Sequence, residues 1–363
     1  MKITLIAGAR PNFMKIAPII HAIKITQNKG NNITYRLVHT GQHYDAKMSD
    51  TFFEELHIPH PDANLECGGG SQAEQTAAIM IAFEKELITN PADLVMVVGD
   101  VTSTMACSIV AKKLNTKVAH VEAGIRSFDL TMPEEINRMV TDSITDYFFT
   151  TTTWAGENLI KSGVDSDRIF FVGNVMIDTL LANRSKFKAP DFWKDFNLKE
   201  KEYFVLTLHR PANVDGAEKL KELIYEITAN TNGLPSIFPM HPRTAKIYKE
   251  LGISSQNLFI VDPLGYHEFN YLVERAKGVI TDSGGITEET TVMGVPCITL
   301  RDNTERPETV STGTNELIGT NPKAIKPILD KLFSGNWKSG EIPELWDGKA
   351  AERIVNIVLE LKK

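Results

Sequence analysis

Carboxylates stand where several apolar runs end, the positions at which a parallel sheet presents side chains to a ligand. Asp100 and Glu122 each follow such a run, and Glu134 lies in the first turn of a helix that Pro133 would begin. Each alone has a structural explanation, such as capping a helix or complementing its dipole. Three carboxylates at one sheet edge indicate instead a site with like charges close together, which suits acid–base chemistry.

Basic residues occupy equivalent positions. Arg10 and Lys15 follow the first apolar run, and their place there favours a binding role over a solvated loop. In the second half His209 follows one predicted strand, and His241 and Arg243 follow the next. A lone histidine is more often structural, but two after successive strands, both beside arginine, indicate a site.

An anion site is predicted at Ser283, Gly284 and Gly285, which follow an apolar run and open a helix. Glycine lets a ligand approach the backbone, and the unpaired N–H groups of the first turn attract a diphosphate. The alternative is that Ser283 merely caps the helix. Glu289 lies more than one turn inside that helix, where it would accept from ribose hydroxyls or simply be solvated.

Alternation of short apolar runs with amphipathic stretches predicts the elements that position these residues. The runs are continuous, as in strands buried on both faces of a parallel sheet. The first half predicts strands at 3–7, 35–39, 94–98, 118–121, 147–150 and 169–172, and helices beginning near Phe13, Ser49, Ser71, Ser103, Pro133 and Trp154. Ser71 and Glu74 have capping-box spacing.

The polar stretch 183–201 interrupts this rhythm, which restarts with strands at 203–207, 236–238, 258–261, 278–281 and 297–300. Two such arrays predict an α/β fold of two Rossmann-like, doubly wound parallel-sheet domains facing a cleft. We place the domains at residues 1–175 and 176–349, and expect the last helix, about 350–363, to pack back on the first domain.

Composition excludes several classes of protein. The 363 residues are 42% hydrophobic and 23% charged with a net charge of −7, which is the balance of a soluble protein rather than one that binds nucleic acid. No apolar run approaches the roughly 18 residues of a membrane span. Cys67, Cys107 and Cys297 have no disulfide or zinc spacing, so we expect reduced thiols and a cytoplasmic location.

Cofactor motifs are not found. The stretch 68–73 fits the dinucleotide pattern G-x-G-x-x-A, but it does not follow the first strand and no acidic residue stands at the expected distance. We therefore expect no nicotinamide, and no metal-binding motif stands in the sequence.

Taken together, these motifs resemble the non-hydrolysing UDP-N-acetylglucosamine 2-epimerases, which have the two-domain GT-B fold. The resemblance runs from Gly8 to about Gly319. It implies catalytic roles for Asp100, Glu122, Glu134, Arg138 and His209. It implies substrate contacts for Arg10, Lys15, His241, Arg243, Phe269, Ser283, Gly284, Gly285, Glu289 and Arg306, with Phe269 beside the uracil and Arg306 in a T-E-R-P loop. One departure is Asn12, because the family's first motif usually reads G-T-R-P-E.

The implied reaction removes the proton from carbon 2 as UDP leaves carbon 1, giving a 2-acetamidoglucal to which UDP and a proton add back. It needs two acid–base groups but no metal or other cofactor. The resemblance also implies a homodimer and a part in making cell-surface polysaccharide precursors. The alternatives are a 2-epimerase of a diacetamido-uronic or 6-deoxy UDP-sugar, a hydrolysing epimerase, a GT-B glycosyltransferase, or a UDP-sugar-binding protein without activity.

Overall fold

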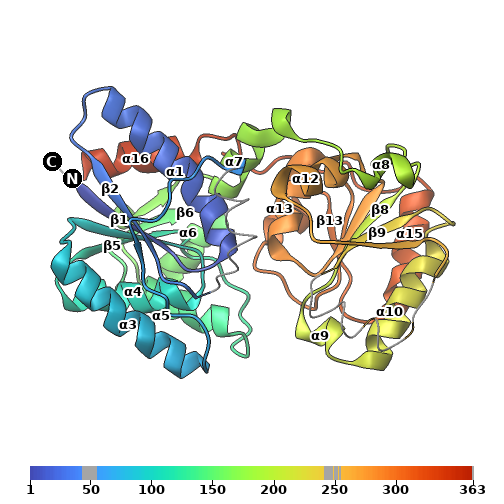
Figure 1. Ribbon diagram of the computed structural model, residues 1–363, viewed down its shortest axis with the longest axis horizontal. Coiled ribbons are helices and arrows are strands. Elements are labelled where there is room, and N and C mark those ends of the chain that lie inside the picture. The colour runs from blue at the N-terminus through green and yellow to red at the C-terminus, as the bar shows by residue number, and fades with distance from the viewer. Residues whose placement is uncertain (43–54, 241–247, 249–251, 253–254, 362–363) are drawn as a thin grey trace. The chain divides into compact units, whose positions relative to one another are not determined.

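The computed structural model describes residues 1–42, 55–240, 248, 252 and 255–361 (Figure 1). Its contacts divide the chain into two units. Unit 1 comprises Met1–Ala182 and Glu344–Lys363, and unit 2 comprises Asn183–Pro343. The first boundary falls seven residues beyond the position placed from the sequence, near the end of helix α7 (Val175–Asn183). Each unit has its own sheet and its own cores.

The described strands of unit 1 form a parallel sheet in the order β3-β2-β1-β4-β5-β6-β7. Its strands are β1 Lys2–Ala7, β2 Thr34–His39, β3 Ala63–Asn64, β4 Leu94–Val98, β5 Lys117–Val121, β6 Tyr147–Thr150 and β7 Ile169–Phe171. The order reverses direction between β1 and β4, which pair with Ile3 opposite Leu94. A reversal of this kind opens a crevice at the carboxyl ends of the two strands, where doubly wound sheets bind ligands.

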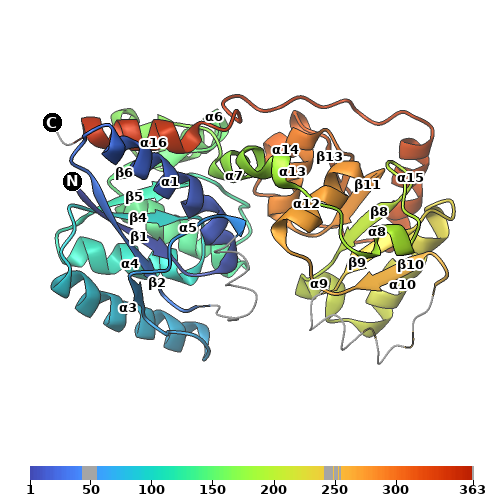
Figure 2. The ribbon, with the colours of Figure 1, turned by 45° about the horizontal axis from the view of Figure 1, so that its top comes forward.

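Helices cover the unit 1 sheet. They are α1 Arg10–Asn28, α3 Gln72–Thr89, α4 Thr102–Lys113, α5 Pro133–Ile144, α6 Thr153–Lys161, α7 Val175–Asn183 and α16 Ala350–Glu360, with a 3₁₀ turn at Ser166–Arg168. α3 packs on α4 and α4 on α5, while the C-terminal helix α16 packs on α1. Figures 1 and 2 both show α1 and α16 side by side, away from α3 and α4.

Helix α3 shows how the sequence builds this layer. The Ser71 hydroxyl accepts from the Glu74 N–H at 3.3 Å, and the Glu74 carboxylate accepts from the Ser71 N–H at 2.8 Å, which confirms the predicted capping box. Ile79, Phe83 and Leu87 then recur every four residues and are buried against β1, β2 and β4. Removing the Phe83 ring would cost about 3–5 kcal/mol, because the packed core cannot close over the space.

The described strands of unit 2 form a second parallel sheet, in the order β10-β9-β8-β11-β12-β13. They are β8 Phe204–Thr207, β9 Ser236–Pro239, β10 Leu258–Val261, β11 Gly278–Thr281, β12 Cys297–Thr299 and β13 Asn315–Leu317. The order reverses between β8 and β11. Successive residues of β8 enter opposite cores, with Phe204 and Leu206 on one face and Val205 on the other, as predicted for a strand buried on both faces.

The helices of unit 2 cover both faces of this sheet. They are α8 Phe192–Asp195, α9 Pro211–Val214, α10 Ala217–Asn230, α12 Tyr266–Arg275, α13 Gly284–Met293, α14 Pro307–Ser311 and α15 Ile325–Phe333, with 3₁₀ turns at Arg184–Lys186 and Pro322–Ala324. α10 packs on α15, and α13 packs on α12 and α14. α13 begins directly after β11, so its first turn lies at the reversal point.

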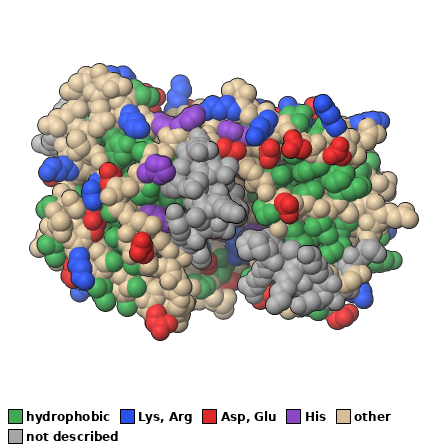
Figure 3. Space-filling view, viewed as in Figure 1, with side chains coloured by type: hydrophobic (Ala, Val, Ile, Leu, Met, Phe, Trp, Pro, Cys, Tyr) green, Lys and Arg blue, Asp and Glu red, His purple; other side chains and the backbone are tan. Residues whose placement is uncertain are grey.

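Charged side chains of both signs are interspersed over the described part of the face in Figure 3. Among the residues described, none of the helices combines the length and the apolar character that a membrane crossing requires.

Candidate functional site

Lys15 and Glu122 form an ion pair at the carboxyl edge of the unit 1 sheet. Lys15 comes from the second turn of α1 and Glu122 from the end of β5, and their Nζ and Oε2 atoms are 2.6 Å apart. Both side chains are largely buried. Glu122 has a φ of 69°, a left-handed conformation that costs a non-glycine residue on the order of 1–3 kcal/mol. The fold therefore holds Glu122 in a strained backbone conformation, in which its carboxylate contacts Lys15.

Asp100 pairs with a buried arginine at the same edge. Arg138 of α5 lies with Nη1 2.5 Å from Asp100 Oδ2, and its Nη2 is 2.6 Å from Glu135 Oε2. Asn137 donates to the Asp100 carbonyl at 2.8 Å, which fixes the turn after β4 to the same helix. The structure thus brings together the predicted residues Asp100 and Arg138, and adds Glu135, which sequence reasoning missed.

Glu135 and Glu134 are adjacent but lie in different environments. Glu135 is buried and accepts from the Ser127 and Phe128 N–H groups and from Arg138. Burial alone would raise the pKa of Glu135, but the Ser127 N–H and Arg138 outweigh it and lower the pKa. Glu134 is exposed in the first turn of α5, at the end of the helix that attracts negative charge.

Gly99 lies between the Lys15–Glu122 ion pair and Asp100. It precedes Asp100 with a φ of +71°, and a Cβ there would lie 3.2 Å from Lys15 Nζ and 3.9 Å from Glu122 Oε2. A side chain at this position would be strained and would press on the Lys15–Glu122 pair. The Asp100 turn and this pair are therefore in close contact.

A buried charge network lies behind this edge. His120 of β5 is 2.8 Å from the Gly99 carbonyl through Nε2 and 2.7 Å from Asp142 Oδ1 through Nδ1. Each ring nitrogen therefore lies within hydrogen-bond distance of an acceptor oxygen. Burial alone would raise the pKa of Asp142, but His120 and Arg126 outweigh it and lower the pKa. The network fixes the Gly99 turn against α5.

The β1–α1 turn explains the departure at Asn12. The buried Asn12 amide oxygen accepts from the Gly8 and Ala9 N–H groups at 3.1 and 2.9 Å, and its nitrogen donates to the Val98 carbonyl at 2.9 Å. A carboxylate could not make the last bond. Arg10 begins α1, and its side chain lies outside the described residues.

The first turn of α13 has the features of an anion site. Ser283 occupies the N-cap position, but its side chain makes no capping hydrogen bond, contrary to the alternative that it only caps the helix. A Cβ on Gly284 would lie 3.1 Å from Glu305 Oε1 and 3.6 Å from Arg301 Nη1. Glycine therefore leaves room at this turn beside Arg301 and Glu305, of which the carboxylate is the nearer group.

Arg301 is a residue that the site predictions omitted. It follows β12, it is buried, and its Nη2 is 2.6 Å from Glu305 Oε2, whereas its buried Nη1 has no hydrogen-bond partner among the described residues. Burial alone would raise the pKa of Glu305, but Arg301 outweighs it and lowers the pKa to about 2. Arg306, which was predicted, instead pairs with buried Glu288 at 2.6 Å.

His209 and Asp282 form a contact at the reversal point of the unit 2 sheet. His209 follows β8 and Asp282 follows β11, and His209 Nδ1 lies 2.8 Å from Asp282 Oδ1. The histidine side chain is 50% exposed and the aspartate is fully buried. The predicted catalytic histidine is thus held by a residue beside the predicted anion site.

Glu289 is buried rather than solvated, and the Tyr266 hydroxyl donates to its Oε1 at 2.9 Å. Burial raises the pKa of Glu289 to about 7, although the hydrogen bonds from Tyr266 and Asn270 oppose the shift. Phe269 is half-buried against one core of unit 2. The predicted residues His241 and Arg243 lie outside the described residues.

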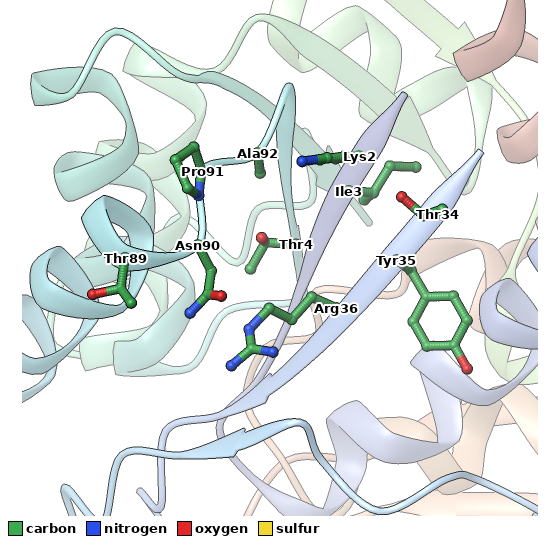
Figure 4. A pocket seen from close by; sticks show the side chains of 10 residues that line it. All are labelled: Lys2, Ile3, Thr4, Thr34, Tyr35, Arg36, Thr89, Asn90, Pro91 and Ala92. Carbon is green, nitrogen blue, oxygen red and sulfur yellow. The ribbon is translucent and has the colours of Figure 1, made fainter. Parts of the chain in front are cut away.

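A cavity of about 250 Å³ lies elsewhere, at the amino edge of the unit 1 sheet (Figure 4). Thr4, Arg36 and Asn90 are among the residues that line it, and Figure 4 shows these side chains between β1, β2 and the end of α3. It contains none of the predicted site residues. Over the described part of the chain, no group of three or more His, Cys, Asp or Glu residues could hold a metal ion.

The signals for the missed residues were present in the sequence. Glu135 stands three positions before Arg138, the spacing of a helical ion pair, and Arg301 follows a strand as the predicted cations do. Which of two adjacent glutamates faces inward depends on the rotation of α5.

Comparison with known proteins identifies the family. The family model for UDP-N-acetylglucosamine 2-epimerase matches residues 25–359. The chain is 44% identical over 373 residues to a UDP-N-acetylglucosamine 2-epimerase of Methanocaldococcus jannaschii, covering 99% of each protein. It is 39% identical over 359 residues to UDP-2,3-diacetamido-2,3-dideoxy-D-glucuronate 2-epimerase of Pseudomonas aeruginosa, covering 95% of this chain and 99% of that one.

Solved structures agree. The chain resembles the crystal structure of Methanocaldococcus jannaschii UDP-GlcNAc 2-epimerase in complex with UDP-GlcNAc and UDP, with a TM-score of 0.89, 42% identity, and coverage of 99% of this chain and 100% of that chain. The expected fold class, two doubly wound parallel-sheet domains of GT-B type, is confirmed. The chain belongs to the UDP-N-acetylglucosamine 2-epimerase family and is an isomerase.

Proposed function

We propose that this protein interconverts UDP-N-acetylglucosamine and UDP-N-acetylmannosamine by eliminating UDP and adding it back. The observation that carries the proposal is a pair of carboxylates at one sheet edge, each in an ion pair with a basic side chain. Asp100 pairs with Arg138, and Glu122 pairs with Lys15. Inversion at carbon 2 needs a base to take a proton from one face and an acid to return one to the other. Asp100, Glu122 and exposed Glu134 are the groups that we assign to these transfers.

The chemistry follows from the leaving group. A base takes the carbon 2 proton, the electron pair of that bond becomes the C1–C2 double bond, and the C1–O bond breaks as UDP departs. The reverse sequence delivers UDP to carbon 1 and a proton to the opposite face of carbon 2. Arg138 keeps Asp100 in place, and Lys15 with Arg10 would stabilise charge that develops on the departing diphosphate.

The nucleotide half of the proposal lies in unit 2. We assign three kinds of donor to the diphosphate beside Gly284 and Gly285. They are the first N–H groups of α13, the Ser283 hydroxyl, which makes no capping hydrogen bond, and Arg301 Nη1. Phe269 is assigned to the uracil, and His241, Arg243 and Arg306 to the substrate. Since Tyr266 donates to Glu289 Oε1, we assign the ribose hydroxyls to Glu289 Oε2.

Proton NMR in D₂O tests the reaction directly. Purified protein with UDP-N-acetylglucosamine, and without added metal or cofactor, should yield UDP-N-acetylmannosamine with deuterium at carbon 2. Accumulation of free UDP with N-acetylmannosamine would replace the proposal with a hydrolysing epimerase. Bound UDP without carbon 2 exchange would favour a glycosyltransferase.

A second substrate has a specific observation in its favour. The Pseudomonas aeruginosa relative, which is 39% identical over 359 residues, acts, by its name, on a diacetamido glucuronate. The same NMR assay with UDP-diacetamido-uronic and 6-deoxy UDP-sugars distinguishes the substrates by their rates of deuterium incorporation.

The proposed enzyme supplies precursors of cell-surface polysaccharide and acts as a homodimer. We assign the dimer interface to the exposed face of α5. This helix buries polar residues and exposes Ile136 and Met139, while Phe128 and Leu130 are exposed just before it. Apolar side chains on the outer face are typical of a subunit interface. Light scattering should show a dimer that Met139→Glu weakens, whereas Ile81→Glu, at an exposed position of α3, should leave it intact.

A further inference from the structure

Asp282, the buried carboxylate that follows β11, accepts hydrogen bonds from several groups. It accepts from the His209 N–H, which lies 3.1 Å from both Oδ1 and Oδ2, from the Arg210 N–H at 3.0 Å and from Asn213 Nδ2 at 3.1 Å, in addition to the His209 ring. The backbone and Asn213 donors meet chiefly at Oδ2, and the ring nitrogen lies at Oδ1. Several elements thus cooperate to place one oxygen against one imidazole nitrogen.

These contacts keep Asp282 ionised in a fully buried position. Burial alone would raise the pKa of Asp282, but the His209 ring, Asn213 and the Arg210 N–H outweigh it and lower the pKa. An ionised carboxylate accepts only, so His209 Nδ1 must donate to it. In the neutral ring the lone pair is then on Nε2.

We infer that Asp282 is a positioning residue that fixes His209 with hydrogen on Nδ1, so that Nε2 accepts from the bound UDP-sugar. The inference rests on the proposed function for its substrate, but the state of the imidazole can be measured without one. It gives a reason for a buried aspartate directly before the anion site, because the aspartate orients the histidine that follows the neighbouring strand β8.

The geometry predicts what Asp282→Asn would do. The Arg210 N–H and Asn213 Nδ2 approach Oδ2, and the His209 N–H lies 3.1 Å from each oxygen. The amide oxygen of the variant would therefore take the Oδ2 place, and its NH₂ group would face His209 Nδ1. Nδ1 would then have to accept, and hydrogen would move to Nε2. The variant therefore keeps the shape of the side chain at position 282 and reverses the tautomer of the His209 ring.

Nitrogen-15 NMR of histidine-labelled, full-length protein tests the first half, with His209→Gln used to assign the His209 signals. At about pH 8.5, where an imidazole is ordinarily neutral, the wild-type protein should show protonated Nδ1 and unprotonated Nε2. The Asp282→Asn variant should show the opposite. Protonated Nε2 in the wild type would overturn the inference, even if the variant fails to fold.

Kinetics test the second half. Asp282→Asn and His209→Gln should each lower kcat about a hundredfold or more, with KM changed no more than about threefold. The double variant should be no slower than His209→Gln alone, since Asp282 acts only through His209. Asp330→Asn, in an exposed ion pair on α15, is the matched control and should keep wild-type rates.

Wild-type kcat in Asp282→Asn, or a double variant slower by the product of the single effects, would overturn the inference. Failure of the proposed function appears differently: the wild-type enzyme would then incorporate no deuterium at carbon 2 of any UDP-sugar tested. In that case the nitrogen-15 measurement still decides whether Asp282 fixes the ring.

Discussion

At the scale of single residues, Glu134 and Glu135 show how one step along a helix changes a side chain's role. Successive residues are rotated by about 100°, which turns Glu135 into the Arg138 network and leaves Glu134 exposed. The two residues therefore make a matched pair for separating catalysis from stability.

Glu134→Gln should lower turnover at least about a hundredfold, the cost of losing a general acid or base, with an unchanged melting temperature. Asp100→Asn should do the same while UDP still binds. Glu135→Gln should instead lower the free energy of unfolding by about 3 kcal/mol or more, because it weakens a buried ion pair. Steady-state rates and thermal unfolding measure both effects. A near-normal rate in Glu134→Gln would remove Glu134 from the mechanism.

Ser283→Ala and Arg301→Gln should each weaken UDP binding about tenfold to a hundredfold, since each removes a hydrogen bond to a charged group. Calorimetric titration with UDP checks this. Ser311→Ala, at the exposed end of α14, is the control and should bind UDP normally. Unchanged affinity in both site variants would place the diphosphate elsewhere.

The residues at strand ends could be predicted because the fold puts them at one edge, whereas their partners could not. Nothing in the sequence says that Arg306 pairs with Glu288 while Arg301 faces the first turn of α13. Such choices depend on side-chain packing between segments far apart in the chain.

At the scale of elements, strand prediction succeeded where the apolar run was long enough to be read. β4, β6, β10 and β11 have the predicted bounds. β3 and β13 were missed: each is a short strand at a sheet edge, and Asn315–Leu317 has a single apolar residue. The helix predicted near Ser49 begins outside the described residues.

The attachment of α16 is also an element-scale feature. Asp178 of α7 accepts from the Ala350 and Ala351 N–H groups at 3.1 and 2.7 Å, so a side chain from another helix caps α16. Burial raises the pKa of Asp178 to about 6, against the lowering effect of these two bonds.

The sign of the resulting pH dependence follows from linkage. Because the folded protein holds the Asp178 proton more tightly, stability from this group is complete below pH 3.8 and is lost as pH rises through about 6. A pKa raised from 3.8 to about 6 corresponds to about 3 kcal/mol. Between pH 4 and pH 7, the free energy of unfolding of Asp178→Asn should therefore rise by about that much relative to that of the wild type. A difference in unfolding free energy that is constant with pH would contradict this.

At the scale of the whole molecule, each unit has its own parallel sheet and its own candidate groups. The acid–base carboxylates lie in unit 1, and the anion site and His209 lie in unit 2. Ligand binding and proton transfer should therefore be separable in variants that leave each unit folded.

Hydrogen exchange tests this division. UDP at about 100 times its dissociation constant should stabilise the protein by about 2.7 kcal/mol. It should slow amide exchange most at Gly284 and Gly285, whose N–H groups are the proposed donors. Asp100→Asn should retain this protection and Ser283→Ala should lose most of it. Protection confined to unit 1 would contradict the assignment of the nucleotide.

The chain leaves unit 1 after Ala182 and returns to it at Glu344, which has a consequence for synthesis on the ribosome. Unit 2 is complete before the last helix is translated, so it can fold while unit 1 still lacks α16. The surface of α1 that α16 covers stays open until α16 has left the ribosome, and until then Asp178 lacks the backbone N–H groups that it caps. A released chain that ends before residue 344 should therefore carry a finished second unit beside an unfinished first one.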